Sequence, residues 1–263
     1  MTSRINRIFK ESNKKLVTFT TAGDPDIQTS IKIIEKILKN KCDIIEIGMP
    51  FSDPMADGPT IQLSSNRAIK NGVTLNEIFY ICKKIRKINN TTPIILMGYY
   101  NVIYNYGIKK FVNSCKKNEI DGLIIVDLQP EEDSDLVNEL KKNNIDLIRL
   151  ITPTTDKKRL KIILKNATGF LYYVTITGIT GQKTADINGL KKSIKEIKKY
   201  TSLPIVAGFG IKNKKHVKQI CKVVDGAVVG SSIVKIVEDN LGNKKKMLNK
   251  IELFTKNLKS GTN

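Results

Sequence analysis

The fold is decided by a short repeating pattern, and its clearest copy reads Ile44-Ile45-Glu46-Ile47-Gly48. This run is apolar except for one carboxylate, which is typical of a strand buried on both faces. A loop and a segment of helical periodicity follow it. Further runs of the same kind occur at residues 16–22, 93–99, 122–127, 147–152, 170–175, 204–210 and 226–230.

The segments between these runs repeat apolar residues at the three- and four-residue spacing of a helix, clearest at residues 27–38, 75–88, 134–140 and 190–197. Eight strand–helix alternations imply parallel strands, and eight parallel strands close a barrel. The sequence therefore predicts an α/β protein in which residues 1–263 form a single (β/α)8 TIM barrel domain. An open doubly wound sheet is the alternative, but no glycine-rich fingerprint follows the first strand.

Two additions to the barrel are also expected. An extra N-terminal helix is predicted over residues 4–11. An inserted helix follows the second strand, beginning near Pro59 and ending at Asn71-Gly72. Proline at the first turn and glycine after the last turn are the usual helix boundaries.

The net charge of +20 raises the hypothesis of a nucleic-acid-binding protein. The lysines are spread over most of the predicted helices, without interleaved aromatic residues, which favours solvated helix faces and no nucleic-acid partner. The chain contains no run of the roughly 20 apolar residues that a membrane span needs, and its first residues do not resemble a signal peptide. We expect no membrane association and a cytoplasmic location.

The cysteines and the histidine limit the chemistry. The four cysteines are far apart, and His216 is the only histidine. A zinc site and a histidine-based triad are therefore not expected, and neither is any other metal site. No predicted strand end carries a lysine suited to a Schiff base. Carboxylates remain as the candidate acids and bases.

Glu46 is the first of these candidates. Side chains alternate along a strand, so Ile45 and Ile47 are predicted to face the helices and Glu46 the barrel interior. Burial should raise the pKa of Glu46 into a range useful for proton transfer. The alternative is a buried glutamate paired with a cation, for which Arg149 is the available strand residue.

The loop after this strand adds two acids, Asp53 and Asp57, among three prolines. Either aspartate alone could be a turn or cap residue, which is the favoured interpretation for an arbitrary loop aspartate. Beside Glu46, a second carboxylate in a different environment favours a catalytic pair with separated pKa values.

Glycines follow the last two predicted strands. Gly210 ends the seventh, and Gly230 with Ser231 ends the eighth. These are the positions where barrels of this kind frequently bind phosphate, although tight turns alone would also use glycine. Residues 175–184, rich in glycine and threonine, suit a mobile lid, the alternative being a loop with no role. The residues thus indicate carboxylate chemistry on a phosphorylated small molecule.

Residues 43–62 closely resemble the signature of the tryptophan synthase alpha subunit family. The resemblance continues in order through residues 97–101, Asp127, and residues 172–181, 208–211 and 230–231. It implies a lyase of tryptophan biosynthesis that cleaves indole-3-glycerol phosphate to indole and glyceraldehyde 3-phosphate by a retro-aldol reaction. Glu46 would be the acid and base of that reaction, and Asp57 would bind the indole N–H and stabilise the charge on the ring.

The same resemblance implies further site residues and a partner. Backbone groups near the phosphate, pocket aromatics and a lid residue would bind substrate: Phe19, Tyr99, Tyr172, Thr180, Gly181, Phe209, Gly210, Gly230 and Ser231. Pro50 and Asp53 would touch a beta subunit in an α2β2 heterotetramer. Pyridoxal phosphate is expected only in that beta subunit, with no cofactor in this chain.

Two positions depart from the family pattern. Gln129 stands where members commonly have a second proline, and Val102 stands where many have proline. Both put in doubt the rigidity of loops at the barrel mouth. Two other functions remain open: a non-catalytic barrel that activates a partner enzyme, and another phosphate-binding barrel isomerase.

Overall fold

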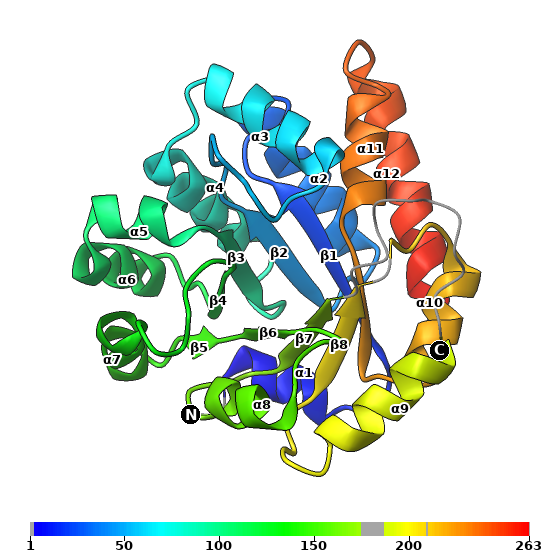
Figure 1. The fold of residues 1–263 in the computed structure, drawn as a ribbon. Helices are drawn as coiled ribbons and strands as arrows, with labels where there is room; N and C mark the ends of the chain where they lie inside the picture. The colour runs from blue at the N-terminus through cyan, green and yellow to red at the C-terminus, as the bar shows by residue number, and fades with distance from the viewer. Residues whose placement is uncertain (1–2, 175–186, 209, 263) are drawn as a thin grey trace.

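The computed structural model describes residues 3–174, 187–208 and 210–262. Within those residues the chain forms one parallel sheet surrounded by helices (Figure 1), with strand order β5-β4-β3-β2-β1-β9-β8-β7-β6. The strands are β1 Lys15–Thr21, β2 Ile44–Gly48, β3 Ile94–Gly98, β4 Gly122–Ile125, β5 Asp146–Leu147, β6 Arg149–Ile151, β7 Leu171–Val174, β8 Ile205–Gly208 and β9 Gly226–Val229.

The two ends of this strand order are neighbours in the chain. β5 pairs with β4 and β6 pairs with β7, and only Ile148 separates β5 from β6. The predicted fifth strand is therefore one extended segment that consists of β5 and β6. It pairs with both edges of the sheet and so closes the barrel. The result is the predicted TIM barrel of eight strand segments.

The helices follow the strands in the order expected for βα units. They are α1 Arg4–Lys10, α2 Ile27–Lys39, α3 Pro59–Lys70, α4 Leu75–Ile88, α5 Tyr100–Tyr106, α6 Ile108–Lys117, α7 Ser134–Asn143, α8 Lys157–Leu164, α9 Ile187–Ile197, α10 Lys214–Cys221, α11 Ser231–Glu238 and α12 Lys244–Lys259. The predicted N-terminal helix is α1, and the predicted inserted helix is α3. A second inserted helix, α5, was not predicted, because only Ile103 of its seven residues is buried.

The ends of α3 explain why its prediction was accurate. Gly58 is the N-cap and Pro59 the first helical residue, where a missing N–H costs nothing. The helix ends at Asn71, and Gly72 then adopts φ +75°, which favours glycine. The loop that carries Asp57 therefore ends where α3 begins, at Gly58 and Pro59.

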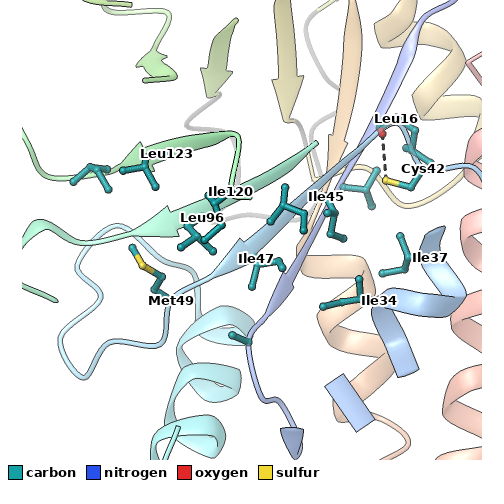
Figure 2. Close-up of a cluster of buried hydrophobic side chains, with 14 of the residues drawn as sticks. Leu16, Ile34, Ile37, Cys42, Ile45, Ile47, Met49, Leu96, Ile120 and Leu123 are labelled. Atoms are coloured by element: carbon teal, nitrogen blue, oxygen red, sulfur yellow. Dashed lines mark hydrogen bonds between the residues drawn. The ribbon is translucent and has the colours of Figure 1, made fainter. Parts of the chain in front are cut away.

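The core has two layers, because each strand buries both of its faces. Ile45 and Ile47 belong to the outer layer between strands and helices, together with Ile34 and Ile37 of α2 (Figure 2). The inner layer fills the barrel and contains Val17, Ile44, Ile95, Ile124, Ile148, Phe170, Val206 and Val228. Ile44 thus points inward, and the alternation predicted for β2 is confirmed.

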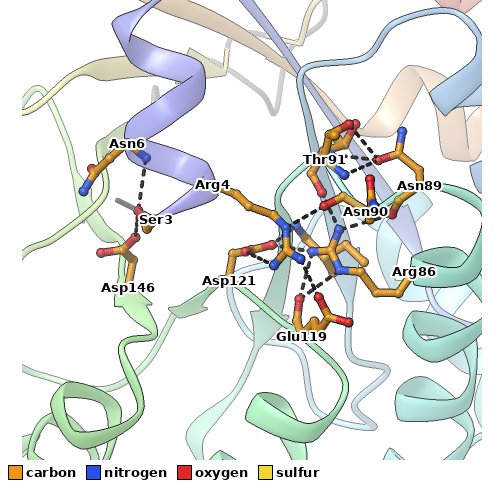
Figure 3. Close-up of polar contacts among 12 residues, drawn as sticks. Ser3, Arg4, Asn6, Arg86, Asn89, Asn90, Thr91, Glu119, Asp121 and Asp146 are labelled. Carbon is orange, nitrogen blue, oxygen red and sulfur yellow. Dashed lines mark hydrogen bonds and ion pairs between the residues drawn. The ribbon is translucent and has the colours of Figure 1, made fainter. Parts of the chain in front are cut away.

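Helix α1 covers the N-terminal end of the barrel. Its Ile5 is fully buried in the inner layer. Its Arg4 pairs with Glu119 and Asp121, and Asp121 also pairs with Arg86 of α4 (Figure 3). This end of the barrel is closed by a plug and an ion-pair network, so an accessible site must lie at the opposite, C-terminal mouth.

Candidate active site at the barrel mouth

Glu46 lies inside the barrel with 0% of its surface exposed. Neither carboxylate oxygen has a hydrogen-bond partner among the described residues. Burial without compensation raises the pKa of Glu46 to about 8. The alternative of a buried ion pair is not observed, because Arg149 pairs with Asp133 instead. A buried, unpaired carboxyl that holds its proton near neutral pH is an unusual group, and such groups concentrate at functional sites.

Two aromatic side chains accompany Glu46. Phe19 is its register partner on β1. Burial, and after it the charge of Glu46, raises the pKa of Tyr172 on β7. Both rings occupy space that glycines leave open. A β-carbon on Gly48 would lie 2.5 Å from Phe19 Cζ, and one on Gly208 would lie 2.8 Å from the Tyr172 hydroxyl. Glycines at the strand ends therefore make room for the aromatic walls of the site.

Asp57 stands on the loop between β2 and α3, and it is half-buried. Burial raises its pKa, and a hydrogen bond with the Tyr99 hydroxyl lowers it in part. Tyr99, at the end of β3, also accepts a hydrogen bond of 3.0 Å from the amide of Ala56. Its ring stacks on Phe51 with centroids 5.1 Å apart. A buried tyrosine thus holds the loop at Ala56, next to Asp57, and its hydroxyl favours the ionised form of the Asp57 carboxyl.

The same loop forms the rim of the mouth. Asp53 is exposed and accepts a hydrogen bond from Ser52, and Pro50 is half-buried. Met55 is 84% exposed. An apolar side chain this exposed beside an acid is available for contact with another protein.

The loops after β8 and β9 meet, as predicted for a phosphate site. Gly230 caps α11, which begins at Ser231, so the N-terminus of this helix lies at the mouth. The Ser232 hydroxyl donates to the Ile211 carbonyl at 2.6 Å and ties the two loops together. Gly210 adopts φ +58°, a conformation that a side chain would strain. Three predicted residues, Thr180, Gly181 and Phe209, lie outside the described residues.

The loop after β4 shows what replaces the missing proline. The side chain of Gln129 accepts a hydrogen bond from Arg159 of α8, which also pairs with Glu131. Deeper in the structure, buried Arg149 pairs with Asp133, the residue before α7. This loop is held by side chains of the following βα unit. The sequence interpretation missed both arginine contacts, because they depend on closure of the barrel.

All four cysteines are free and buried, and His216 lies on the outer helix α10. Among residues 3–174, 187–208 and 210–262, no group of three or more His, Cys, Asp or Glu residues could hold a metal ion. In the same residues, no helix is long and apolar enough to cross a membrane.

Comparisons with known proteins agree on one family. Residues 5–263 match the family model described as tryptophan synthase alpha chain. The tryptophan synthase alpha chain of Petrotoga mobilis (strain DSM 10674 / SJ95) is 45% identical over 257 residues, which cover 98% of this chain and 99% of that protein. The crystal structure of tryptophan synthase subunit alpha from Legionella pneumophila str. Paris has a TM-score of 0.92 and 30% identity, covering 100% and 99% of the two chains. A chain of tryptophan synthase from M. tuberculosis, in an open form with BRD0059 bound, has a TM-score of 0.88 and 25% identity, covering 99% and 98%.

Proposed function

The chain belongs to the tryptophan synthase alpha chain family, and we propose that Glu46 and Asp57 carry out the family's reaction in it. That reaction is a lyase step of tryptophan biosynthesis, the cleavage of indole-3-glycerol phosphate to indole and glyceraldehyde 3-phosphate. The observation that carries the assignment of residues is the buried, unpaired carboxyl of Glu46.

Glu46 is the proton carrier. With its pKa raised to about 8, its carboxyl is largely protonated at neutral pH and can donate to C3 of the indole ring. The resulting carboxylate then accepts the proton of the C3′ hydroxyl. As that O–H bond breaks, the C3–C3′ bond cleaves, its electrons return to the indole ring and an aldehyde forms. Glu46 ends the cycle protonated, as it began.

Asp57 stabilises the intermediate. Protonation at C3 places a positive charge on the ring nitrogen, so a carboxylate beside N1 lowers the energy of that state. For this role Asp57 must be ionised, and the Tyr99 hydroxyl favours its ionised form. The two carboxyls therefore have different roles. The fully buried Glu46 transfers protons, and the half-buried Asp57 supplies a negative charge.

The remaining site residues bind substrate. Phe19, Tyr99 and Tyr172 enclose the indole ring, and Gly210, Gly230 and Ser231 present backbone groups to the phosphate at the start of α11. We assign substrate contact to Thr180, Gly181 and Phe209 as well, because the family resemblance implies it. The support is the meeting of the two glycine loops at Ser232 and Ile211 and the helix N-terminus beside them.

The partner is a beta subunit in an α2β2 heterotetramer, reached through the rim at Pro50 and Asp53. The exposed Met55 between the acids of this loop supports such a contact. Pyridoxal phosphate belongs to the beta subunit, and this chain acts in the cytoplasm with its own side chains and without a cofactor. Residues 1–263 act as one barrel domain.

The loop itself offers a matched pair of variants. In the isolated chain, Asp57→Asn should lower kcat/KM for indole release at least about 100-fold, since a preorganised charge is worth roughly 3 kcal/mol. Asp53→Asn, four residues earlier in the same loop, should leave that rate unchanged. With a beta subunit added, Asp53→Asn should lose activation. Equal rates for Asp57→Asn and the unmodified chain would overturn the proposal.

A further inference from the structure

Asp127 is the acid at the end of β4 that no step of the reaction uses. It is exposed at the mouth, and its Oδ1 accepts a hydrogen bond of 2.8 Å from the amide of Tyr100. Tyr100 is the first residue of α5, and Tyr99 is its N-cap, without a side-chain cap of its own. Asp127 therefore supplies from another βα unit the capping oxygen that α5 lacks, and it fixes the backbone next to Tyr99.

The Tyr99 hydroxyl has a defined hydrogen-bond direction. It accepts from the amide of Ala56, so its single proton is free for another acceptor. The carboxyl of Asp57, the residue after Ala56, is the acceptor beside it. The order is Ala56 N–H to Tyr99 O–H to Asp57. Because the ring also stacks on Phe51, one side chain holds the beginning and the end of the loop.

We propose that Asp127 and Tyr99 are positioning residues that act together to hold Asp57 in place at the mouth of the barrel. Asp127 fixes the start of α5 by accepting a hydrogen bond from the Tyr100 amide. The hydroxyl of the preceding residue, Tyr99, then contacts the loop that carries Asp57. This inference rests on the proposed function, because it assigns a task to Asp57. It gives Tyr99 a second role beside contact with the ring of the substrate.

The charged groups near Tyr99 are consistent with these positioning roles. Burial, and after it the charges of Asp57 and Asp127, raise the pKa of Tyr99 to about 12. The phenol therefore keeps its proton at neutral pH. The group that favours the ionised form of Asp57 is this hydroxyl.

The test uses Tyr99→Phe, which keeps the ring and its stacking on Phe51 and removes the hydroxyl that accepts from the Ala56 amide and donates to Asp57. The matched control is Tyr104→Phe, an exposed tyrosine on the same helix. With indole-3-glycerol phosphate as substrate, Tyr99→Phe should lower kcat/KM at neutral pH at least about tenfold, the worth of a hydrogen bond to a charged group. The acidic limb of its pH profile should move to higher pH, because Asp57 loses the donor that favours ionisation. Tyr104→Phe should change neither.

Two further variants separate positioning from substrate contact. In an Asp57→Asn background, Tyr99→Phe should cost less than threefold, because the partner of its proton is gone. Asp127→Asn keeps an oxygen for the Tyr100 amide and should retain most activity, whereas Asp127→Ala should lose at least about tenfold. The inference would be overturned if the acidic limb of the pH profile did not move in Tyr99→Phe. It would also be overturned if Tyr99→Phe lowered kcat/KM equally in the unmodified and the Asp57→Asn backgrounds. An active Asp57→Asn variant would instead overturn the proposed function.

Discussion

Phe19 and Gly48 face each other across adjacent strands so closely that the ring of Phe19 fills the place of a side chain on Gly48. Its Cζ lies 2.5 Å from the position of a β-carbon there, and its Cε2 lies 2.7 Å away. Gly48 ends the strand that carries Glu46, and Phe19 is the register partner of Glu46. The glycine thus sets the position of an aromatic wall next to the catalytic carboxyl.

Gly48→Ala should therefore displace Phe19 and impair substrate binding. We expect KM for indole-3-glycerol phosphate to rise more than kcat falls, because a binding wall moves while both carboxyls remain. Overpacking of this kind also costs about 1–3 kcal/mol of stability. Gly242→Ala is the control, since a β-carbon there would meet nothing within 4 Å. Unchanged steady-state kinetics in Gly48→Ala would show that Phe19 does not line the site.

The pH dependence of the reaction should report both carboxyls. The proposed cycle starts with Glu46 protonated, so kcat/KM of the isolated chain should fall as pH rises through about 8. On the acidic side it should fall as Asp57 is protonated, at a pH above the usual aspartate range. A rate profile from pH 4 to 10 checks both limbs. A profile that stays level up to pH 10 is incompatible with Glu46 as the initial proton donor.

Burial of Glu46 should also make stability depend on pH. Its pKa is 4.5 in the unfolded reference and about 8 in the folded protein, so the folded state binds more protons between these values. Stability contributed by the neutral carboxyl is present below pH 4.5 and is lost as pH rises through about 8. Relative to the unmodified chain, Glu46→Gln should become more stable by a few kcal/mol, on the order of magnitude given by one pKa unit per 1.36 kcal/mol.

Urea unfolding of both proteins at pH 5 and pH 8.5 measures this effect. The difference in free energy of unfolding should be larger at pH 8.5. Asp53→Asn, which changes an exposed acid, should show no comparable trend. A difference that is the same at both pH values would mean that Glu46 has an ordinary pKa in the folded protein.

The stability of the protein should depend strongly on the buried ion pair of Arg149 and Asp133. Both side chains are almost fully buried, 6% and 2% exposed, and burial lowers the pKa of Arg149 to about 10. Arg149→Met alone strands the Asp133 carboxylate and should cost about 3–5 kcal/mol in free energy of unfolding. The double variant Arg149→Met with Asp133→Leu should recover much of that loss. If the double variant is less stable than the single one, the pair is not what links the loop after β4 to β6.

The sequence predicted those parts of the site that depend on strand parity. Glu46 could be placed inside the barrel because side chains alternate strictly along a strand, and the observed β2 has the predicted bounds. Gly230 and Ser231 could be placed at the mouth because they follow a strand directly. The role proposed for Asp57 came from the family resemblance, since an aspartate in a proline-rich loop has no direction that its sequence specifies.

Contacts between distant βα units could not be predicted. The Tyr99 hydroxyl reaches Ala56 across 43 residues, and Arg159 reaches Gln129 across 30. Such contacts depend on the exact packing of neighbouring strand ends, which periodicity does not encode. For the same reason periodicity did not indicate that Gly48 and Gly208 make space for aromatic rings.

The central claim is that the Glu46 carboxyl carries the proton in the cleavage of indole-3-glycerol phosphate. The most direct measurement is indole release at pH 7 by the unmodified chain and by Glu46→Gln, with circular dichroism to show that both are folded. The unmodified chain should release indole, and the glutamine variant should release none above background while still binding glycerol phosphate. Indole release by folded Glu46→Gln at the rate of the unmodified chain would contradict the claim.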